Sequence, residues 1–71
     1  MKYLLLDKNE INKISMFINT PFKYTHLKTI KLDNGDELVL LAEKTKDDLY
    51  KIVWVSMSSY NTIDEKLIYG N

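Results

Sequence analysis

Residues 30–40 read IKLDNGDELVL, and this stretch contains the turn that decides the fold. Asparagine and glycine tolerate left-handed backbone, so the Asn-Gly pair in its middle is typical of a tight hairpin. Two registers compete for the flanking strands. A two-residue loop places Ile30 opposite Val39, whereas a three-residue loop with a left-handed Gly35 places Ile30 opposite Leu38. We predict the second register, because it collects the apolar residues of both strands on one face.

The first strand of this hairpin begins well before the turn. Residues 22–32 alternate between apolar and polar side chains, as a half-buried strand does, with Leu27 and Lys28 outside the alternation. The alternation predicts that one face of this strand carries Phe22, Tyr24, His26, Ile30 and Leu32. Residues 36–44 form its antiparallel partner.

A third strand continues the meander after a polar turn. The turn occupies residues 45–48 and the strand occupies residues 49–57. Residues 52–55 read IVWV, a continuous run of strand-forming side chains. Such a run is typical of a central strand or of a strand covered on both faces, so we expect a central position in the sheet or cover on both faces.

Two capping signals predict helices before and after the meander. Asp7 and Glu10 have the spacing of a capping box, and an apolar stripe at helical spacing follows, up to the break at the only proline. The stripe consists of Ile11, Ile14, Phe17 and Ile18. Thr62 and Glu65 repeat the capping spacing, which predicts a short C-terminal helix, with a strand as the alternative. An apolar run at residues 2–6 predicts a short strand ahead of the first helix.

The predicted fold class is therefore α+β. It comprises a short N-terminal strand, one helix, a three-stranded antiparallel β-meander and a short C-terminal helix or strand. The 71 residues suffice for one small domain, which spans residues 1–71. No segment approaches the length of a membrane span, and polar residues interrupt the N-terminal apolar run before it resembles a signal peptide. We therefore predict a cytoplasmic protein without membrane contact.

Composition excludes several function classes. The chain has no cysteine and one histidine, so neither a disulfide nor a zinc site is expected, and we predict no metal and no cofactor. The formal net charge is zero and no arginine is present, which disfavours nucleic-acid binding through phosphate contacts alone.

The sequence contains no catalytic motif, and we predict neither enzymatic activity nor catalytic residues. A catalytic histidine needs an orienting carboxylate or a nucleophile, and Glu43 on the next strand is the one weak candidate to orient His26. A structural role is expected for His26. The acidic residues around the turn at 45–48 lack the spacing of a calcium loop, so a solvated turn is expected there.

The predicted sheet has more apolar surface than one helix can cover. If Ala42 lies near Lys51 in the second hairpin, the helix covers the face that contains Leu40 and Val53. The opposite face is then open, and we predict that it binds a protein partner or a second copy of the chain. Its residues are Leu27, Val39, Leu41, Tyr50, Ile52 and Trp54. In the alternative, the C-terminal segment folds back over this face.

These observations predict a non-enzymatic protein-interaction module that acts by occupying a surface, with Tyr50 and Trp54 as anchors. Small size, zero net charge, residue usage typical of A/T-rich codons and the lack of enzyme motifs fit the profile of small phage and mobile-element proteins. Many of these inhibit host proteins, so an inhibitor resembling the antagonists of CRISPR effectors is the specific version of the prediction. The alternative is a small nucleic-acid-binding regulator with a lysine-lined strand carrying Lys23, Lys28 and Lys31.

Overall fold

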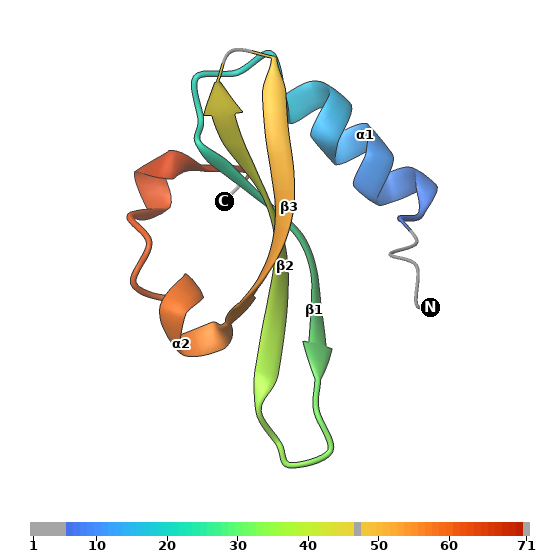
Figure 1. Cartoon of the computed structure of the whole chain (residues 1–71), viewed down its shortest axis with the longest axis vertical. Helices are drawn as coiled ribbons and strands as arrows, with labels where there is room; N and C mark the ends of the chain where they lie inside the picture. The colour runs from blue at the N-terminus through green and yellow to red at the C-terminus, as the bar shows by residue number, and fades with distance from the viewer. Residues whose placement is uncertain (1–5, 47, 71) are drawn as a thin grey trace.

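The computed structural model describes residues 6–46 and 48–70, and it confirms an α+β fold. In chain order the elements are α1 (Lys8–Phe17), β1 (Tyr24–Lys31), β2 (Glu37–Lys46), β3 (Leu49–Ser56), α2 (Met57–Tyr60), the 3₁₀ turn η1 (Glu65–Leu67) and β4 (Ile68–Tyr69). The sheet has the order β3-β2-β1-β4, in which β4 adds in parallel to the predicted antiparallel meander (Figure 1). The strand predicted at residues 2–6 lies outside the described residues except for Leu6, which packs against the core.

Helix α1 begins where the capping signal predicts. The Asp7 carboxylate accepts a hydrogen bond from Glu10 N at 2.9 Å, which satisfies one of the free amides at the helix N-terminus. The helix ends at Phe17, close to the predicted break. Ile14 and Phe17 are buried, whereas Ile11 of the expected stripe is 51% exposed. The helix therefore buries a narrower stripe than the spacing predicts.

The first hairpin has the predicted register. Ile30 lies opposite Leu38, as the three-residue loop requires. Gly35 has a φ of 92°, and its N–H donates to Leu32 O at 2.9 Å, which closes the loop. Local turn chemistry thus sets the pairing of β1 with β2.

Strand β1 contains a β-bulge where the alternation of its sequence breaks. The register with β2 shifts between His26 and Lys28, so Leu27 is an extra residue on β1. Tyr24 and His26 therefore lie on one face of the sheet and Ile30 on the other. This corrects the prediction that these three residues share a face, and it turns Leu27 into the core, where it is 4% exposed.

The second hairpin differs by one residue from the expected register. Ala42 lies opposite Ile52 instead of near Lys51, because the pairing shifts beside the turn, where Thr45 is an extra residue in β2. Side chains alternate along a strand, so the shift moves every side chain of β3 to the other face. Val53, which was expected under α1, lies on the opposite side of the sheet.

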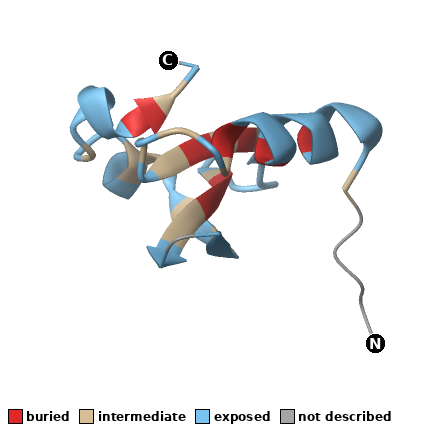
Figure 2. Cartoon of the chain, turned by 90° about the horizontal axis from the view of Figure 1, so that it is seen from above, coloured by how far each residue is buried: buried red, intermediate tan, exposed pale blue. Residues whose placement is uncertain are grey.

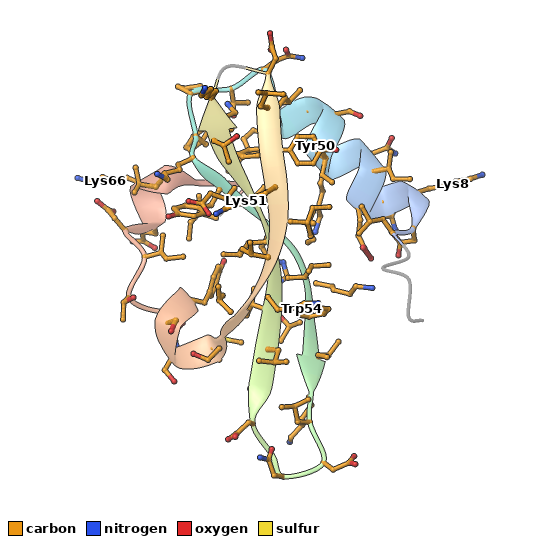
Figure 3. All side chains as sticks on the ribbon, in the orientation of Figure 1. Lys8, Tyr50, Lys51, Trp54 and Lys66 are labelled. Atoms are coloured by element: carbon orange, nitrogen blue, oxygen red, sulfur yellow. The ribbon has the colours of Figure 1, made fainter. Side chains whose placement is uncertain are left out.

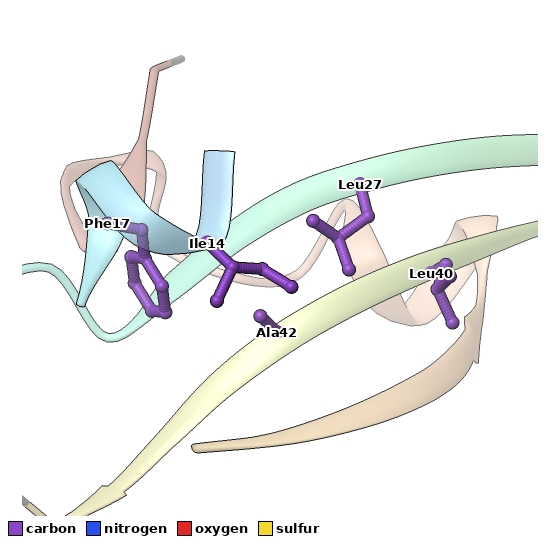
Figure 4. Close-up of a cluster of buried hydrophobic side chains, with 5 residues drawn as sticks. All are labelled: Ile14, Phe17, Leu27, Leu40 and Ala42. Atoms are coloured by element: carbon purple, nitrogen blue, oxygen red, sulfur yellow. The ribbon is translucent and has the colours of Figure 1, made fainter. Parts of the chain in front are cut away.

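Two layers cover the sheet, one on each face. Helix α1 packs on one face around the cluster of Ile14, Phe17, Leu27, Leu40 and Ala42 (Figure 4). The C-terminal segment from α2 to β4 lies over the other face, where Val39, Leu41 and Ile68 are buried. Figure 2 shows the buried residues in the strands and on the sheet-facing side of α1.

The C-terminal segment does not form the helix predicted over residues 62–69. The Asp64 carboxylate accepts a hydrogen bond from Lys66 N at 3.0 Å and caps the short η1 turn, after which the chain extends into β4. Ile68 then pairs beside Tyr24 of β1. The strand alternative is therefore correct for residues 68 and 69, because pairing with β1 outweighs the local helix signal.

Candidate protein-interaction surface

Strand β3 forms one edge of the sheet. It pairs with β2 on one side, and within the described residues no strand pairs with its other side. None of its eight residues is buried. In Figure 1, β3 lies nearest to the viewer, and no other element crosses in front of it. This corrects the expectation of a strand that is central or covered on both faces: β2 takes an interior position and contains the buried run of residues 39–42.

Two aromatic side chains of β3 stand on the face of the sheet on which α1 lies. Tyr50 is 43% exposed and Trp54 is 42% exposed, and Ile52 between them is partly buried against the core cluster. Helix α1 packs mainly against β1, so it leaves this outer strand accessible. Figure 3 shows Tyr50 beside the helix and Trp54 nearer to the turn between β1 and β2. Exposed tyrosine and tryptophan side chains are enriched at protein interfaces.

The six residues of the predicted open face do not lie together on one face of the sheet. Leu27 is buried under α1, and Val39 and Leu41 are buried beneath the C-terminal segment. The alternative, in which this segment folds back over the sheet, is therefore correct for Val39 and Leu41. The three predicted residues of β3 remain accessible at least in part, on the α1 side, and their role in binding stays a prediction.

Sequence reasoning missed the edge position of β3 and with it Leu49, which is 57% exposed at the start of the strand. The signal was present: the last strand of a three-stranded meander lies at an edge unless another strand adds to it. We refer to the unpaired side of β3, with the side chains of Leu49, Tyr50, Ile52 and Trp54, as the β3 edge surface.

The β3 edge surface carries little charge. Lys51 is the one charged residue of β3, and its Nζ lies 3.7 Å from Glu43 Oε1. Lysines on edge strands commonly hinder pairing with another chain. Figure 3 shows Lys51 and Trp54 on opposite sides of β3. Glu43, which also lies 3.9 Å from Lys23, offsets part of the lysine charge and so weakens the protection of the edge against a second strand.

The three lysines of the predicted nucleic-acid surface do not form one basic strip. Lys23 Nζ lies 3.9 Å from Glu43 Oε2, and Lys28 Nζ lies 3.5 Å from Glu10 Oε1. Lys28 and Lys31 have neighbours on β2 that point to opposite faces of the sheet. Glu10 thus offsets the charge of Lys28, and Glu43, shared between Lys23 and Lys51, offsets part of the charge of Lys23. Both carboxylates weaken the positive potential that phosphate contacts need.

His26 lies between the sheet and the C-terminal layer. Its Nε2 is 2.7 Å from Thr29 Oγ1, and its ring centroid is 5.8 Å from that of Tyr60. Burial, with a smaller contribution from the ammonium group of Lys13, lowers the pKa of His26 below its usual value. Glu43, the carboxylate considered as its orienting partner, pairs with lysines instead. This arrangement favours a structural role for His26.

The chain matches no known protein-family model, no curated protein and no solved structure. Over residues 6–46 and 48–70, no helix has both the length and the apolar character needed to cross a membrane. The same residues contain no group of three or more acidic or histidine side chains placed to hold a metal ion.

Proposed function

We propose that this chain is a small, non-enzymatic protein-interaction module that binds its partner through the β3 edge surface. The observation that carries the proposal is a mostly apolar edge strand of eight residues with no buried residue. Such a strand exposes both unpaired main-chain groups and apolar side chains to water. A partner strand would form hydrogen bonds with the main-chain groups and cover the apolar side chains.

The proposed mode of binding is strand addition anchored by aromatic side chains. Main-chain hydrogen bonds to β3 would set the orientation of the partner, and side chains at alternate positions would set its identity. Tyr50 and Trp54 occupy alternate positions on one face, with Ile52 between them. We expect these two aromatic residues to carry most of the binding energy.

A module without catalytic machinery acts by occupying a surface of its partner. We propose, as the specific version, an inhibitor of a host protein of the kind that phages and mobile elements direct against CRISPR effectors. A chain of 71 residues with zero formal charge and a binding surface free of reactive groups supports this version. A cytoplasmic location belongs to the same proposal, because such targets are found in the cytoplasm.

Two variants with the same charge change test the proposal. Wild-type protein, Trp54→Lys and Met16→Lys are used to capture proteins from the source cell, and each captured protein is then purified and titrated against all three forms. Met16 is 60% exposed on α1, so its lysine variant adds the same charge away from β3.

We expect wild type and Met16→Lys to bind such a protein with the same Kd. Trp54→Lys should bind at least about thirtyfold more weakly, as for the loss of an aromatic hot spot. A captured protein that binds Trp54→Lys as tightly as wild type contradicts the proposal for that complex. If this holds for every captured protein, the β3 edge surface is not the binding site.

The nucleic-acid alternative has less support, because carboxylates lie beside Lys23 and Lys28 and weaken their positive potential. Its test is the anisotropy of labelled single-stranded and duplex DNA at low salt, where phosphate contacts are strongest. Binding that weakens in Lys31→Ala and falls steeply with added salt would favour this alternative. Absence of binding at low salt removes it.

A further inference from the structure

We propose that the partner strand of β3 is β3 of a second copy of this chain, paired antiparallel about a two-fold axis at Ile52. The inference rests on the proposed function, that the β3 edge surface binds a protein strand, and it names a second copy as the occupant in place of a host protein. A two-fold interface brings the same patch of both copies together, so the patch must be complementary to itself. The β3 edge surface meets that condition in one particular register.

The alternation of side chains limits the possible registers. Residues that lie opposite each other in an antiparallel pair point to the same face. Tyr50, Ile52 and Trp54 lie on the face of the sheet that α1 covers, since Ile52 and Trp54 lie opposite Ala42 and Leu40 of the core cluster and Tyr50 is two residues before Ile52. The two-fold axis must therefore pass through a residue of β3 and not between two residues.

An axis at Ile52 pairs apolar residues with apolar residues along the strand, except where Lys51 and Val53 face each other. Ile52 then faces Ile52 of the second copy, Tyr50 faces Trp54, and Leu49 faces Val55. The half-exposed tyrosine and tryptophan would cover each other twice, once on each side of the axis. Aromatic pairs and aromatic pairs with β-branched residues are favourable across strands.

The neighbouring register, with the axis at Val53, fits less well. It places Tyr50 opposite Ser56 and leaves Leu49 opposite Met57, which belongs to α2 and not to the strand. The axis at Ile52 uses residues 49–55 symmetrically, which all lie within β3. The first register is therefore the one we propose.

Nothing described in the fold blocks this arrangement. Helix α1 packs mainly against β1, and no element crosses the outer side of β3 in Figure 1. In the proposed register Lys51 faces Val53 of the second copy, and its own Glu43 lies 3.7 Å away. The interface therefore places no two lysines directly opposite each other.

Sedimentation of the whole chain tests the proposal. We expect a species of twice the 8.4 kDa monomer mass at high micromolar concentration. Trp54 is the only tryptophan, so its emission should shift to shorter wavelength as the protein concentration rises. Trp54→Lys should raise the dimer dissociation constant at least about thirtyfold, while Met16→Lys should leave it unchanged. A wild-type protein that stays at the monomer mass overturns the proposal.

Single cysteines test the register, because the chain contains none of its own. Opposite residues in an antiparallel pair have Cα atoms about 4.5–5.5 Å apart, within the range of a disulfide. Ile52→Cys should therefore form a cross-linked dimer under mild oxidation. In this register Val53 and its copy are diagonal neighbours about 7–8 Å apart, so Val53→Cys should remain monomeric.

Cross-linking of Val53→Cys but not of Ile52→Cys would overturn the register, and a dimer mass that Trp54→Lys leaves intact would overturn the interface. Circular dichroism confirms that each variant is folded. Failure of this inference is distinct from failure of the proposed function. A monomeric chain that binds another protein through Trp54 keeps the function and excludes the second copy.

Discussion

The two layers that cover the sheet are built in different ways. Helix α1 is a continuous helix of ten residues, capped by Asp7, that buries Ile14 and Phe17. The C-terminal layer consists of short elements, and within its described residues 57–70 only Ile68 is buried. It is attached to the sheet by β4 and by the hydrogen bond from Lys23 N to Leu67 O at 3.0 Å. The helix is specified by its own sequence, whereas the C-terminal layer depends on docking to the strands.

The α1 layer should show the largest effect of a single substitution. Phe17 is 0% exposed, and Lys44 Nζ lies 5.0 Å from its ring centroid. Phe17→Ala is expected to lower the free energy of unfolding by about 3–5 kcal/mol, because it leaves a cavity in the main cluster. Urea unfolding followed by circular dichroism measures the loss. The exposed neighbour provides the control, since Met16→Ala should change stability by less than about 0.5 kcal/mol.

A loss below about 1 kcal/mol for Phe17→Ala would contradict the difference between the two layers, because it would mean that α1 contributes no more than an ordinary surface contact.

The C-terminal layer should show a smaller effect that is concentrated at one residue. Ile68 is 5% exposed, whereas its neighbour Leu67 is 42% exposed. Ile68→Ala is expected to cost about 2–3 kcal/mol, at the lower end for a buried aliphatic residue, because the short strand at the edge can relax. Leu67→Ala is the matched control and should cost less than about 1 kcal/mol.

Hydrogen exchange sharpens this test. Ile68→Ala should speed the exchange of amides in the C-terminal layer before it affects those of α1, since layers with few buried contacts open locally. Equal acceleration in both layers would indicate one cooperative unit and remove the distinction between them.

The smallest effect is expected from the titration of His26. Its pKa is lowered in the folded chain, so the unfolded chain binds a proton at higher pH than the folded chain does. The free energy of unfolding therefore has its full value above the pKa of about 6.5 that His26 has in the unfolded chain. It decreases as the pH falls through that value toward the pKa of His26 in the folded chain. Chemical unfolding at a series of pH values measures the decrease. In His26→Gln the free energy of unfolding should depend less on pH below about 6.5. An unchanged dependence would exclude His26 as the source of the decrease.

The first hairpin could be predicted from the sequence because local chemistry specifies it. The Asn-Gly pair sets the loop, and a left-handed Gly35 sets the register that the structure has. The N-cap of α1 was predictable for the same reason, since Asp7 acts on an amide three residues away. Both signals lie within a few residues of the feature that they specify.

The candidate surface could be predicted only in part, because it depends on registers that no local signal marks. Thr45 is an extra residue among several polar residues beside the second turn, and its residue type does not predict the shift in register. The shift of one residue exchanges the faces of β3, so Trp54 joins the side of α1 and separates from Val39 and Leu41. Tyr50 and Trp54 were correctly predicted to be exposed, but the face assembled around them was wrong.

The C-terminal layer was predictable only as one of two alternatives. The capping signal at Thr62 and Glu65 favours a helix, and a single 3₁₀ turn capped by Asp64 forms instead. The decisive interaction is the pairing of Ile68 with Tyr24, which are far apart in the chain. Local propensity is a weak guide where a distant strand competes for the same residues.

The parallel contact between β1 and β4 also has a consequence for the order of events during translation. Thr25 Oγ1 donates to Tyr69 O across a separation of 44 residues in the chain. At about 5–20 residues per second, the ribosome needs roughly 2–9 s to make the intervening residues. Throughout that interval the side of β1 that pairs with β4 lacks that strand. The meander can form early, but the sheet is completed on this side last, after Ile68 and Tyr69 have been synthesised.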